Sequence, residues 1–271
     1  DLVGNLLSAT YPNETAGLQA VRGVTQTFDH LNRLTSETST GVTHSYTHDR
    51  AGNRIETLYG ITGRKLVSSY DRLNRLLHCT ETPSGSQTEH VTQYFYDYNS
   101  NVSRKVLPNN SEKRATFDAF NRRLTESDLD PFGAIVSSFD YSQPQGGYSS
   151  GYDNVGNLLK SVEVYGHASV KNRTLTNTYD RVYRLDEETI VESAGSTTLT
   201  AYQYDKGNNR SSKSVTVDGG VAVVTNSLYG DTTDGYNTNQ LKSASDGTTT
   251  TTFFYDLNGN RSEKKVNGSS V

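Results

Sequence analysis

Histidine and cysteine are the first residues to consider for chemistry, because imidazole and thiolate groups bind metals and act as bases or nucleophiles. His44 and His48 are four residues apart and would share one face of a strand. A zinc site needs three or four ligands, and no third one lies near this pair. His48 also stands where related motifs have an aromatic ring, so we interpret both histidines as structural residues.

A second candidate is the neighbouring pair His78 and Cys79, whose residue types are those of a catalytic dyad. Adjacent residues of a strand point to opposite faces, which disfavours the pair. Cys79 is the only cysteine, so we expect no disulfide framework and no cysteine-based metal site, and we interpret it as a small buried residue. His90, on the other side of the same expected hairpin, belongs to no serine or cysteine arrangement.

Acidic pairs could carry glycosidase chemistry, which needs two carboxylates about 5–10 Å apart in a cleft. Asp128 with Asp130 and Glu187 with Glu188 are such pairs, but we place them in turns and on exposed strands. Repeated aspartates could bind calcium, yet one per turn is better explained by turn formation. The run "GGYSSG" from Gly146 lacks the features of a phosphate loop. We therefore predict no catalytic, cofactor-binding or metal-binding residue and no enzymatic activity.

The elements that carry these residues are repeats, anchored by an aspartate that usually follows an aromatic residue. Asp1 fits a truncated first copy, and Asn237 fits a degenerate copy that is one residue shorter. The remaining anchors are Asp29, Asp49, Asp71, Asp97, Asp118, Asp153, Asp180, Asp205 and Asp256. Eleven anchors thus run from one end of the chain to the other.

Two kinds of anchor alternate, D-x-x-G-N and D-x-x-N-R. The fourth residue after the anchor runs Asn5, Arg33, Asn53, Arg75, Asn101, Arg122, Asn157, Arg184, Asn209, Gln240 (in the short copy) and Asn260. The underlying unit is therefore a pair of motifs. Five pairs fill the 255 residues from Asp1 to Asp256, which gives 51 residues for each pair.

Both kinds of anchor have the chemistry of a turn. An aspartate can accept a hydrogen bond from the backbone two residues on, and glycine or asparagine suits the left-handed conformation that closes the turn. Aromatic residues alternate before the turn, as at Tyr94 and Tyr96, which places both rings on one face of a strand. Return turns are expected between the anchors, at Asn13, Gly41, Gly63, Gly85, Asn110, Asp130, Gly166, Gly195, Gly219 and Gly247.

This order predicts an all-β fold, an antiparallel meander of repeated hairpins with no helix. Low hydrophobicity (32%) raises the question of disorder, but 18 Tyr, 8 Phe and a net charge of only −4 argue against it. We expect a core built largely of tyrosine. Strands of eight to ten residues, about twenty in number, would form a flat sheet ~100 Å wide. So wide a sheet must curl.

The repeated Y-x-Y-D-x-x-G-N-R and Y-D-x-x-N-R-L motifs resemble the YD repeats of Rhs proteins, of the C component of insecticidal toxin complexes and of teneurins. The resemblance covers residues 1–271 and implies one repeat region that forms part of a shell or tube. In the bacterial members, the shell encloses a C-terminal toxin. The closing core segment of that family is missing, because "DPFG" at Asp130 is only a fragment of it, and there is no toxin domain. We therefore assign no self-cleavage site.

Function follows from this resemblance as an expectation. The leading hypothesis is a secreted, non-catalytic scaffold that encloses or displays other components, which places it outside the cell or on its surface. The alternative is an adhesion or carbohydrate-binding module, and a polysaccharide-active enzyme is a distant third. The sequence isoelectric point of about 5.9 argues against nucleic acid, and no apolar run could span a bilayer. Expected partners are further repeat segments or copies of the chain at the sheet edges, an enclosed toxin, or surface glycans.

Three structural expectations can be checked. Tyr46, Tyr70, Tyr96, Tyr152, Tyr179, Tyr204 and Tyr255 should form a ladder that is largely buried or stacked on one sheet face. Arg33, Arg75, Arg122 and Arg184 should each reach an anchor aspartate. Because the chain begins inside one motif and ends after another of the same phase, we expect it to be a piece of something longer whose sheet continues.

Overall fold

The computed structural model describes residues 1–11, 22–167, 172–230 and 239–270. These residues form strands and turns and contain no helix, so none of them lies in a helix that could cross a membrane. The chain divides into two compact units, residues 1–115 with 128–134 and residues 116–127 with 135–271. The expected curl and the prediction of a single repeat region concern the whole chain and stay predictions.

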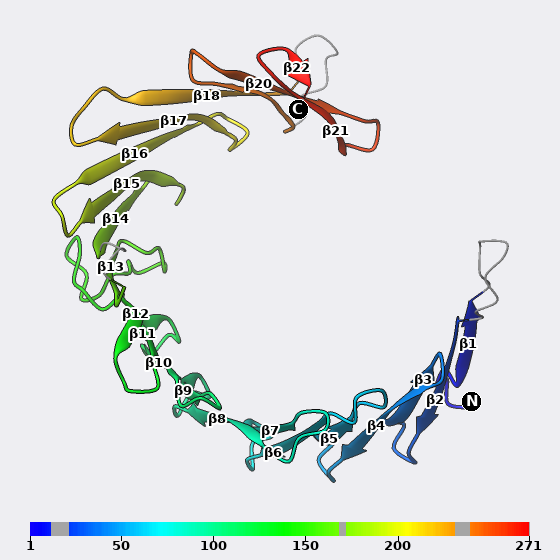
Figure 1. Ribbon diagram of the computed structural model, residues 1–271. Coiled ribbons are helices and arrows are strands. Elements are labelled where there is room, and N and C mark those ends of the chain that lie inside the picture. Colours follow the sequence, from blue (N-terminus) through cyan, green and yellow to red (C-terminus); the bar gives the residue numbers. More distant parts are fainter. Residues whose placement is uncertain (12–21, 168–171, 231–238, 271) are drawn as a thin grey trace. The chain divides into compact units, whose positions relative to one another are not determined.

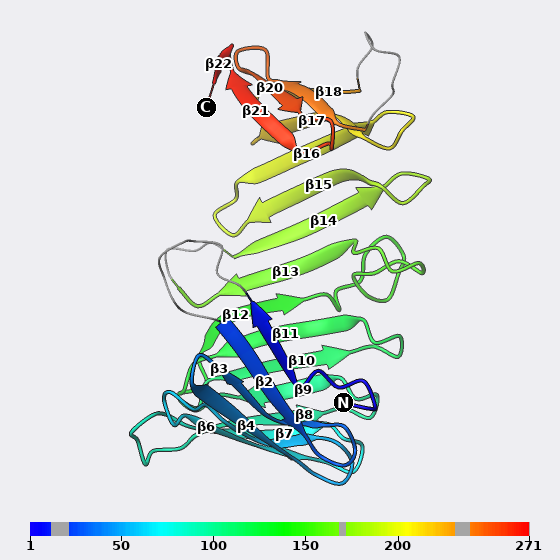
Figure 2. The same cartoon turned by 90° about the vertical axis from the view of Figure 1, so that its right-hand side faces the viewer.

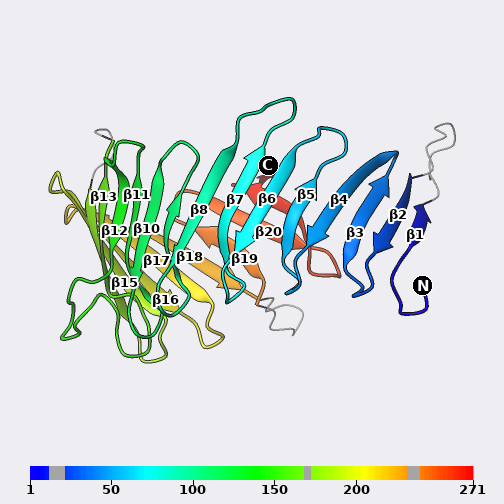
Figure 3. The same cartoon turned by 90° about the horizontal axis from the view of Figure 1, so that it is seen from below.

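The first unit is a meander of short strands, shown in blue and cyan in Figure 1 and side by side in Figure 3. Each strand pairs antiparallel with the next in chain order. The strands are β1 (Ser8–Tyr11), β2 (Arg22–Phe28), β3 (Leu34–Ser39), β4 (Val42–His48), β5 (Arg54–Leu58), β6 (Lys65–Tyr70), β7 (Leu76–Thr82), β8 (His90–Tyr96) and β9 (Val102–Val106). Two more, β10 (Glu112–Phe117) and β11 (Arg123–Leu129), contribute residues to both units.

The second unit repeats this pattern, and Figure 2 shows β13 to β17 lying side by side in chain order. Its strands again pair antiparallel with their chain neighbours. They are β12 (Ile135–Asp140), β13 (Lys160–Tyr165), β14 (Arg173–Tyr179), β15 (Leu185–Glu192), β16 (Thr197–Tyr204), β17 (Arg210–Val217), β18 (Val223–Tyr229), β19 (Leu241–Ser245), β20 (Thr250–Tyr255), β21 (Arg261–Val266) and β22 (Ser269–Ser270). The predicted all-β meander of hairpins is confirmed.

Every return turn in the described residues lies where the sequence placed it, between consecutive strands, and so does every described anchor except Asp1, whose turn precedes β1. The return turn at Asn13 and the degenerate anchor at Asn237 lie outside them. On either side of the Asn237 anchor, Gly230 N–H donates to the Gln240 carbonyl at 3.1 Å. This bond corresponds to the one from the N–H of an anchor aspartate to the carbonyl of the fourth residue on. One further hairpin, between β21 and β22 at Asn267 and Gly268, was not expected from the sequence.

The strands are shorter than predicted. They contain two to eight residues, because each anchor turn takes five residues and a register shift lies beside most of these turns. In the β6–β7 pair, for example, the register shifts between Ser69 and Tyr70, directly before Asp71, and the extra residue is Leu77 of β7. The same shift recurs beside anchors in both units.

The expected tyrosine core is absent. Among the described side chains no hydrophobic one is buried, and the buried side chains are those of the polar Thr57, Ser161, Glu163 and Thr200. The physical reason is that the described strands contact only their neighbours in chain order, so no second layer covers either face. Cohesion must come from contacts between adjacent strands and turns.

Candidate functional site

The anchor aspartate organises its own turn through both carboxylate oxygens. In the Asp71 turn, Oδ1 accepts the backbone N–H groups of Leu73 at 2.8 Å and Arg75 at 2.9 Å, and Oδ2 accepts Arg75 Nε–H at 2.7 Å. Asn74 N–H donates to the Asp71 carbonyl, and Asp71 N–H donates to the Arg75 carbonyl. Asn74 has φ 61°, the left-handed conformation in which asparagine is tolerated.

The same bonds recur in every other described anchor. Oδ1 accepts the backbone N–H of the fourth residue on, and Oδ2 accepts that residue's side chain, at Asp1, Asp29, Asp49, Asp97, Asp118, Asp153, Asp180, Asp205 and Asp256. Hydrogen bonds from the backbone and side chain of Arg33 lower the pKa of Asp29 to about 2. The expected turn role is confirmed.

The arginines of the D-x-x-N-R anchors join successive turns, as predicted for Arg33, Arg75, Arg122 and Arg184. Each binds its own aspartate through Nε. Each also uses Nη1 to reach the following anchor turn, as Arg122 does to the Asp153 carbonyl at 2.8 Å and Arg184 to Asn208 Oδ1 at 2.7 Å. The acceptors for Arg33 and Arg75 are the Asp49 carbonyl and Ser100 Oγ.

Three asparagines of the D-x-x-G-N anchors make a matching link. Asn53 Nδ2 donates to Asp49 Oδ2 within its turn and to Asn74 Oδ1 of the next, both at 2.9 Å. Asn5 reaches Asn32 and Asn209 reaches Asn239 in the same way. The regular alternation of Asn and Arg in the sequence is therefore two chemical solutions to one task, the linking of consecutive turns.

The tyrosine that precedes an anchor binds the strand that leaves the previous anchor. Tyr96 Oη–H donates to the Leu76 carbonyl at 2.8 Å, and Tyr204 Oη–H donates to the Leu185 carbonyl at the same distance. Tyr70, Tyr152, Tyr179 and Tyr255 make the equivalent bond. Each of these tyrosines is half-buried, so the ladder is not largely buried as predicted, and its stacking on one sheet face stays a prediction.

Guanidinium groups cover these rings. The Arg75 guanidinium lies 4.5 Å from the ring centre of Tyr96, and Arg184 lies 4.5 Å from that of Tyr204. Arg122 lies 4.9 Å from the Tyr152 ring. An arginine over an aromatic face gains roughly 0.5–2 kcal/mol. One side chain therefore binds an aspartate, the next turn and the next ring, which explains why the sequence keeps arginine at this position.

The histidines and Cys79 form no catalytic or metal-binding arrangement with one another. His44 Nδ1 accepts Gly60 N–H at 3.4 Å, and its ring meets Tyr59 edge-on at 5.5 Å. His78 pairs with Ser69, whose Oγ lies 3.2 Å from His78 Nδ1, a contact that sequence reasoning missed. The described residues contain no group of three His, Cys, Asp or Glu side chains able to hold a metal ion.

The acidic pairs are also dispersed. Asp128 forms an ion pair with Lys113 at 2.7 Å, whereas Asp130 accepts the backbone N–H groups of Phe132 and Ala134 in a return turn. Glu187 and Glu188 are consecutive in β15, and they pair with Ala201 and Thr200, so they point to opposite faces. Neither pair forms the two facing carboxylates that glycosidase chemistry requires.

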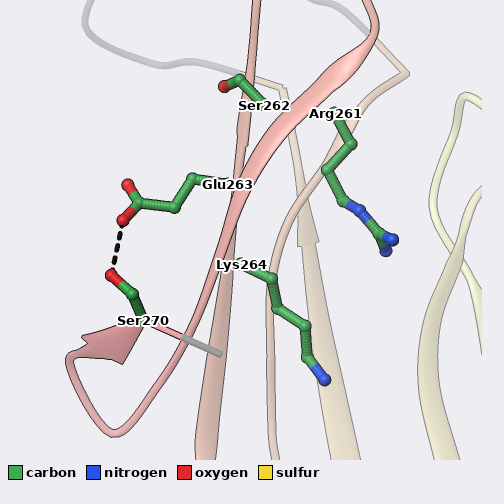
Figure 4. A pocket seen from close by; sticks show the side chains of 5 residues that line it. All are labelled: Arg261, Ser262, Glu263, Lys264 and Ser270. Carbon is green, nitrogen blue, oxygen red and sulfur yellow. Dashed lines mark hydrogen bonds between the residues drawn. The ribbon is translucent and has the colours of Figure 1, made fainter.

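The hollows of the surface are open. Figure 4 shows one of about 480 Å³ at β21 and β22, lined by Arg261, Ser262, Glu263, Lys264 and Ser270. Ser270 Oγ–H donates to Glu263 Oε1, and Figure 4 shows Arg261 and Lys264 projecting to one side of β21 and Ser262 and Glu263 to the other. The lining thus surrounds an exposed strand instead of converging on a bound molecule. The linked anchor turns and their tyrosines are the repeated feature of the described residues, and they are the candidate functional feature of the chain.

Comparison with solved structures supports the fold. The crystal structure of TcdB2-TccC3-Cdc42 matches with a TM-score of 0.65 and 15% identity, over 90% of this chain and 14% of that one. TcdB2-TccC3 without its hypervariable C-terminal region matches with the same values. No family model and no curated protein matches the chain. The chain spans about one seventh of the length of the two solved chains that it matches, and it shares the fold of that part of them.

Proposed function

We propose that the chain is a non-catalytic structural scaffold, a segment of a YD-repeat shell, tube or fibre. The observation that carries this proposal is the linkage of consecutive anchor turns. Arg or Asn side chains join an anchor turn to the next one at seven of the ten described anchors that have an aspartate. Tyrosine hydroxyls add bonds to the strand that leaves the previous anchor, as Tyr204 does. Residues used in this way build a wall.

We propose that the wall encloses or displays other components, with either face able to meet them. In β14 to β16, the register places Leu175, Ile190 and Tyr202 on one face together with Thr198 and Thr200. The opposite face carries Thr174, Thr176 and Thr189 together with Val191 and Leu199. Both faces therefore combine apolar and hydroxyl side chains.

An adhesion or carbohydrate-binding module is less well supported. Glycan binding would use exposed tyrosine rings and free phenolic hydroxyls. Here the anchor tyrosines donate their hydroxyls to backbone carbonyls, and guanidinium groups lie over several of their rings. A polysaccharide-active enzyme would need converging carboxylates, which the described acidic pairs do not supply. We propose further repeat segments or copies of this chain as partners, and a location outside the cell.

Electron microscopy of the purified 271-residue chain would test the scaffold directly, together with light scattering after size-exclusion chromatography. We expect a curved wall, tube or fibre, and a mass that rises with protein concentration. A soluble monomer at high concentration, with both sheet edges covered by its own loops, would contradict assembly. A compact particle with a central cleft would contradict the scaffold itself.

A further inference from the structure

One position of the ladder differs chemically from the rest. His48 occupies the place before Asp49 where six other described anchors have a tyrosine that binds a backbone carbonyl. Its Nδ1 is buried and has no hydrogen-bond partner among the described residues. The register shift characteristic of anchors occurs here too, between Thr47 and His48. His48 thus has the position of the tyrosines without their hydroxyl.

The charged groups around His48 come from three elements. Arg33, in the preceding anchor turn, donates Nη1–H to the Asp49 carbonyl at 2.5 Å, and Arg54 of β5 is the cross-strand partner of His48. The Asp29 and Asp49 carboxylates are the nearby anions, but Asp29 already binds Arg33 and Asp49 already binds Asn53. Arg54 lies over the Tyr46 ring at 4.3 Å. A proton on His48 would add a third cation to this group.

We propose that the junction of the Asp29 and Asp49 turns, with His48 at its centre, is an acid-sensitive joint in the ladder. At the corresponding junctions, Arg75 and Arg184 face tyrosines, which do not change charge between pH 5 and 8. A neutral imidazole tolerates the two guanidinium groups, whereas an imidazolium is repelled by both. Protonation therefore weakens the bond of Arg33 to the Asp49 carbonyl and loosens β3 from β4 and β5.

The direction of the pH dependence follows from the same contacts. Burial, and then the charges of Arg33 and Arg54, lower the pKa of His48 from its usual 6.5. The folded joint therefore binds fewer protons than the open one, so its stability is complete above pH 6.5 and falls as the pH drops through that value. Each unit by which the pKa is lowered makes opening up to about tenfold easier in acid.

Hydrogen exchange of the whole chain at pH 7.5 and pH 5.0, corrected for intrinsic rates, would test this joint. We expect protection of residues 29–54 to fall severalfold at pH 5.0, while protection of residues 71–102 around the Arg75 and Tyr96 junction is unchanged. His48→Tyr and His48→Phe should both remove the effect, since neither side chain titrates in this range.

Tyr96→His should add an acid response at residues 71–102 while that of residues 29–54 remains, which would show that the position and not the local sequence creates it. If Tyr96→His does not fold, the comparison of the unchanged protein with His48→Tyr and His48→Phe still tests the proposal. An equal response of both junctions to pH, or a response that survives in His48→Phe, would overturn the proposal.

Discussion

The anchor turns and the return turns join the same strands, but they do so by different means. Each described anchor aspartate makes the same hydrogen bonds, and at seven of these anchors Arg or Asn then reaches the next turn. Return turns vary from the two residues Thr40 and Gly41 between β3 and β4 to the seven residues 83–89 between β7 and β8. They share mainly a left-handed residue, such as Gly41, Gly85 or Gly195.

This contrast shows which turns determine how the hairpins of the repeat are placed against one another. A return turn only has to reverse the chain, which many sequences can do. An anchor turn also has to fix the register of its hairpin against the next, because a sheet without a buried core gains little from side-chain burial. The anchor side is therefore uniform and linked, and the return side is free to vary.

The largest effect should come from acidification, which we expect to weaken the anchor turns. Hydrogen bonds from the backbone and side chain of Arg33 lower the pKa of Asp29 to about 2, and those from Asn53 lower the pKa of Asp49. Because these folded values lie below the usual 3.8, the anchors contribute stability that is present above pH 4 and lost as the pH falls toward 2.

Thermal unfolding followed by circular dichroism would measure this loss. The melting temperature should fall steeply between pH 4 and pH 2.5, since every anchor contributes. The pKa of Glu112, lowered to about 2 by Arg104 and Arg114, adds to the same window from the return side. A melting temperature that is the same at pH 5 and pH 2.5 would show that the anchor carboxylates do not hold the hairpins.

The second test asks whether a return turn can also contain a position that does not tolerate substitution. Gly60 lies between β5 and β6, and a Cβ there would come within 2.1 Å of the Thr43 carbonyl oxygen. Gly60→Ala should therefore cost about 3 kcal/mol, because backbone cannot move aside as a side chain does. Gly23→Ala is the matched control, since its Cβ would meet only Ala9 O at 3.6 Å. Equal denaturation midpoints for both variants would show that the return turn accommodates a Cβ at Gly60 without loss of stability.

The third test removes an anchor carboxylate. Asp118 accepts Phe120 N–H, Arg122 N–H and Arg122 Nε–H within 2.9 Å. Asp118→Ala should destabilise the chain by about 2 kcal/mol, because it removes three hydrogen bonds to a charged acceptor in a turn that remains partly exposed. Asp246→Ala, in a return turn where the carboxylate accepts Thr248 N–H, Thr248 Oγ1–H and Thr249 N–H, should cost less, because all three donors are neutral and none belongs to an arginine. Similar urea midpoints for the two variants would contradict a special role for anchors.

The sequence predicted the turns well because their chemistry is local. The aspartate, the left-handed residue and the fourth side chain lie within five residues, so a short motif contains the whole turn. The contacts of four arginines with anchor aspartates were also predictable, because an arginine in every second motif needs an anionic partner. These arginines are Arg33, Arg75, Arg122 and Arg184. Nine return turns followed from glycine, asparagine and proline alone.

Burial could not be predicted in the same way. Whether Tyr96 or Tyr204 is covered depends on a second layer, and no property of an aromatic residue in a strand reveals whether one exists. The hydrogen bond from Tyr96 to the Leu76 carbonyl joins residues twenty apart and depends on the bulge before Asp97. The contact of Ser69 with His78 was missed for a similar reason, because it depends on the exact register of β6 and β7.

The fourth test isolates the ladder's hydroxyl. Tyr202 and Tyr204 belong to β16, but only Tyr204 donates its Oη–H to a backbone carbonyl, that of Leu185, among the described residues. Tyr204→Phe should lower the free energy of unfolding by about 1 kcal/mol, the contribution of one such hydrogen bond. Tyr202→Phe should change it by much less. If both variants lose the same amount, the hydroxyl bond does not secure the ladder.

The smallest effect should come from the shape of the linking cation. Arg184 binds Asp180 through Nε, reaches Asn208 through Nη1 and lies over the Tyr204 ring, and a lysine keeps the charge but cannot make all three contacts. Arg184→Lys should cost about 0.5–1 kcal/mol, because the site is partly exposed and salt screens the ion pair. Arg181→Lys, on the exposed tip of the same turn, should change nothing measurable. Hydrogen exchange of residues 205–209 would show the difference most directly, since the next turn loses its tether while its own Asp205 bonds remain. Unchanged protection there would mean that each anchor turn is held by its own hairpin alone.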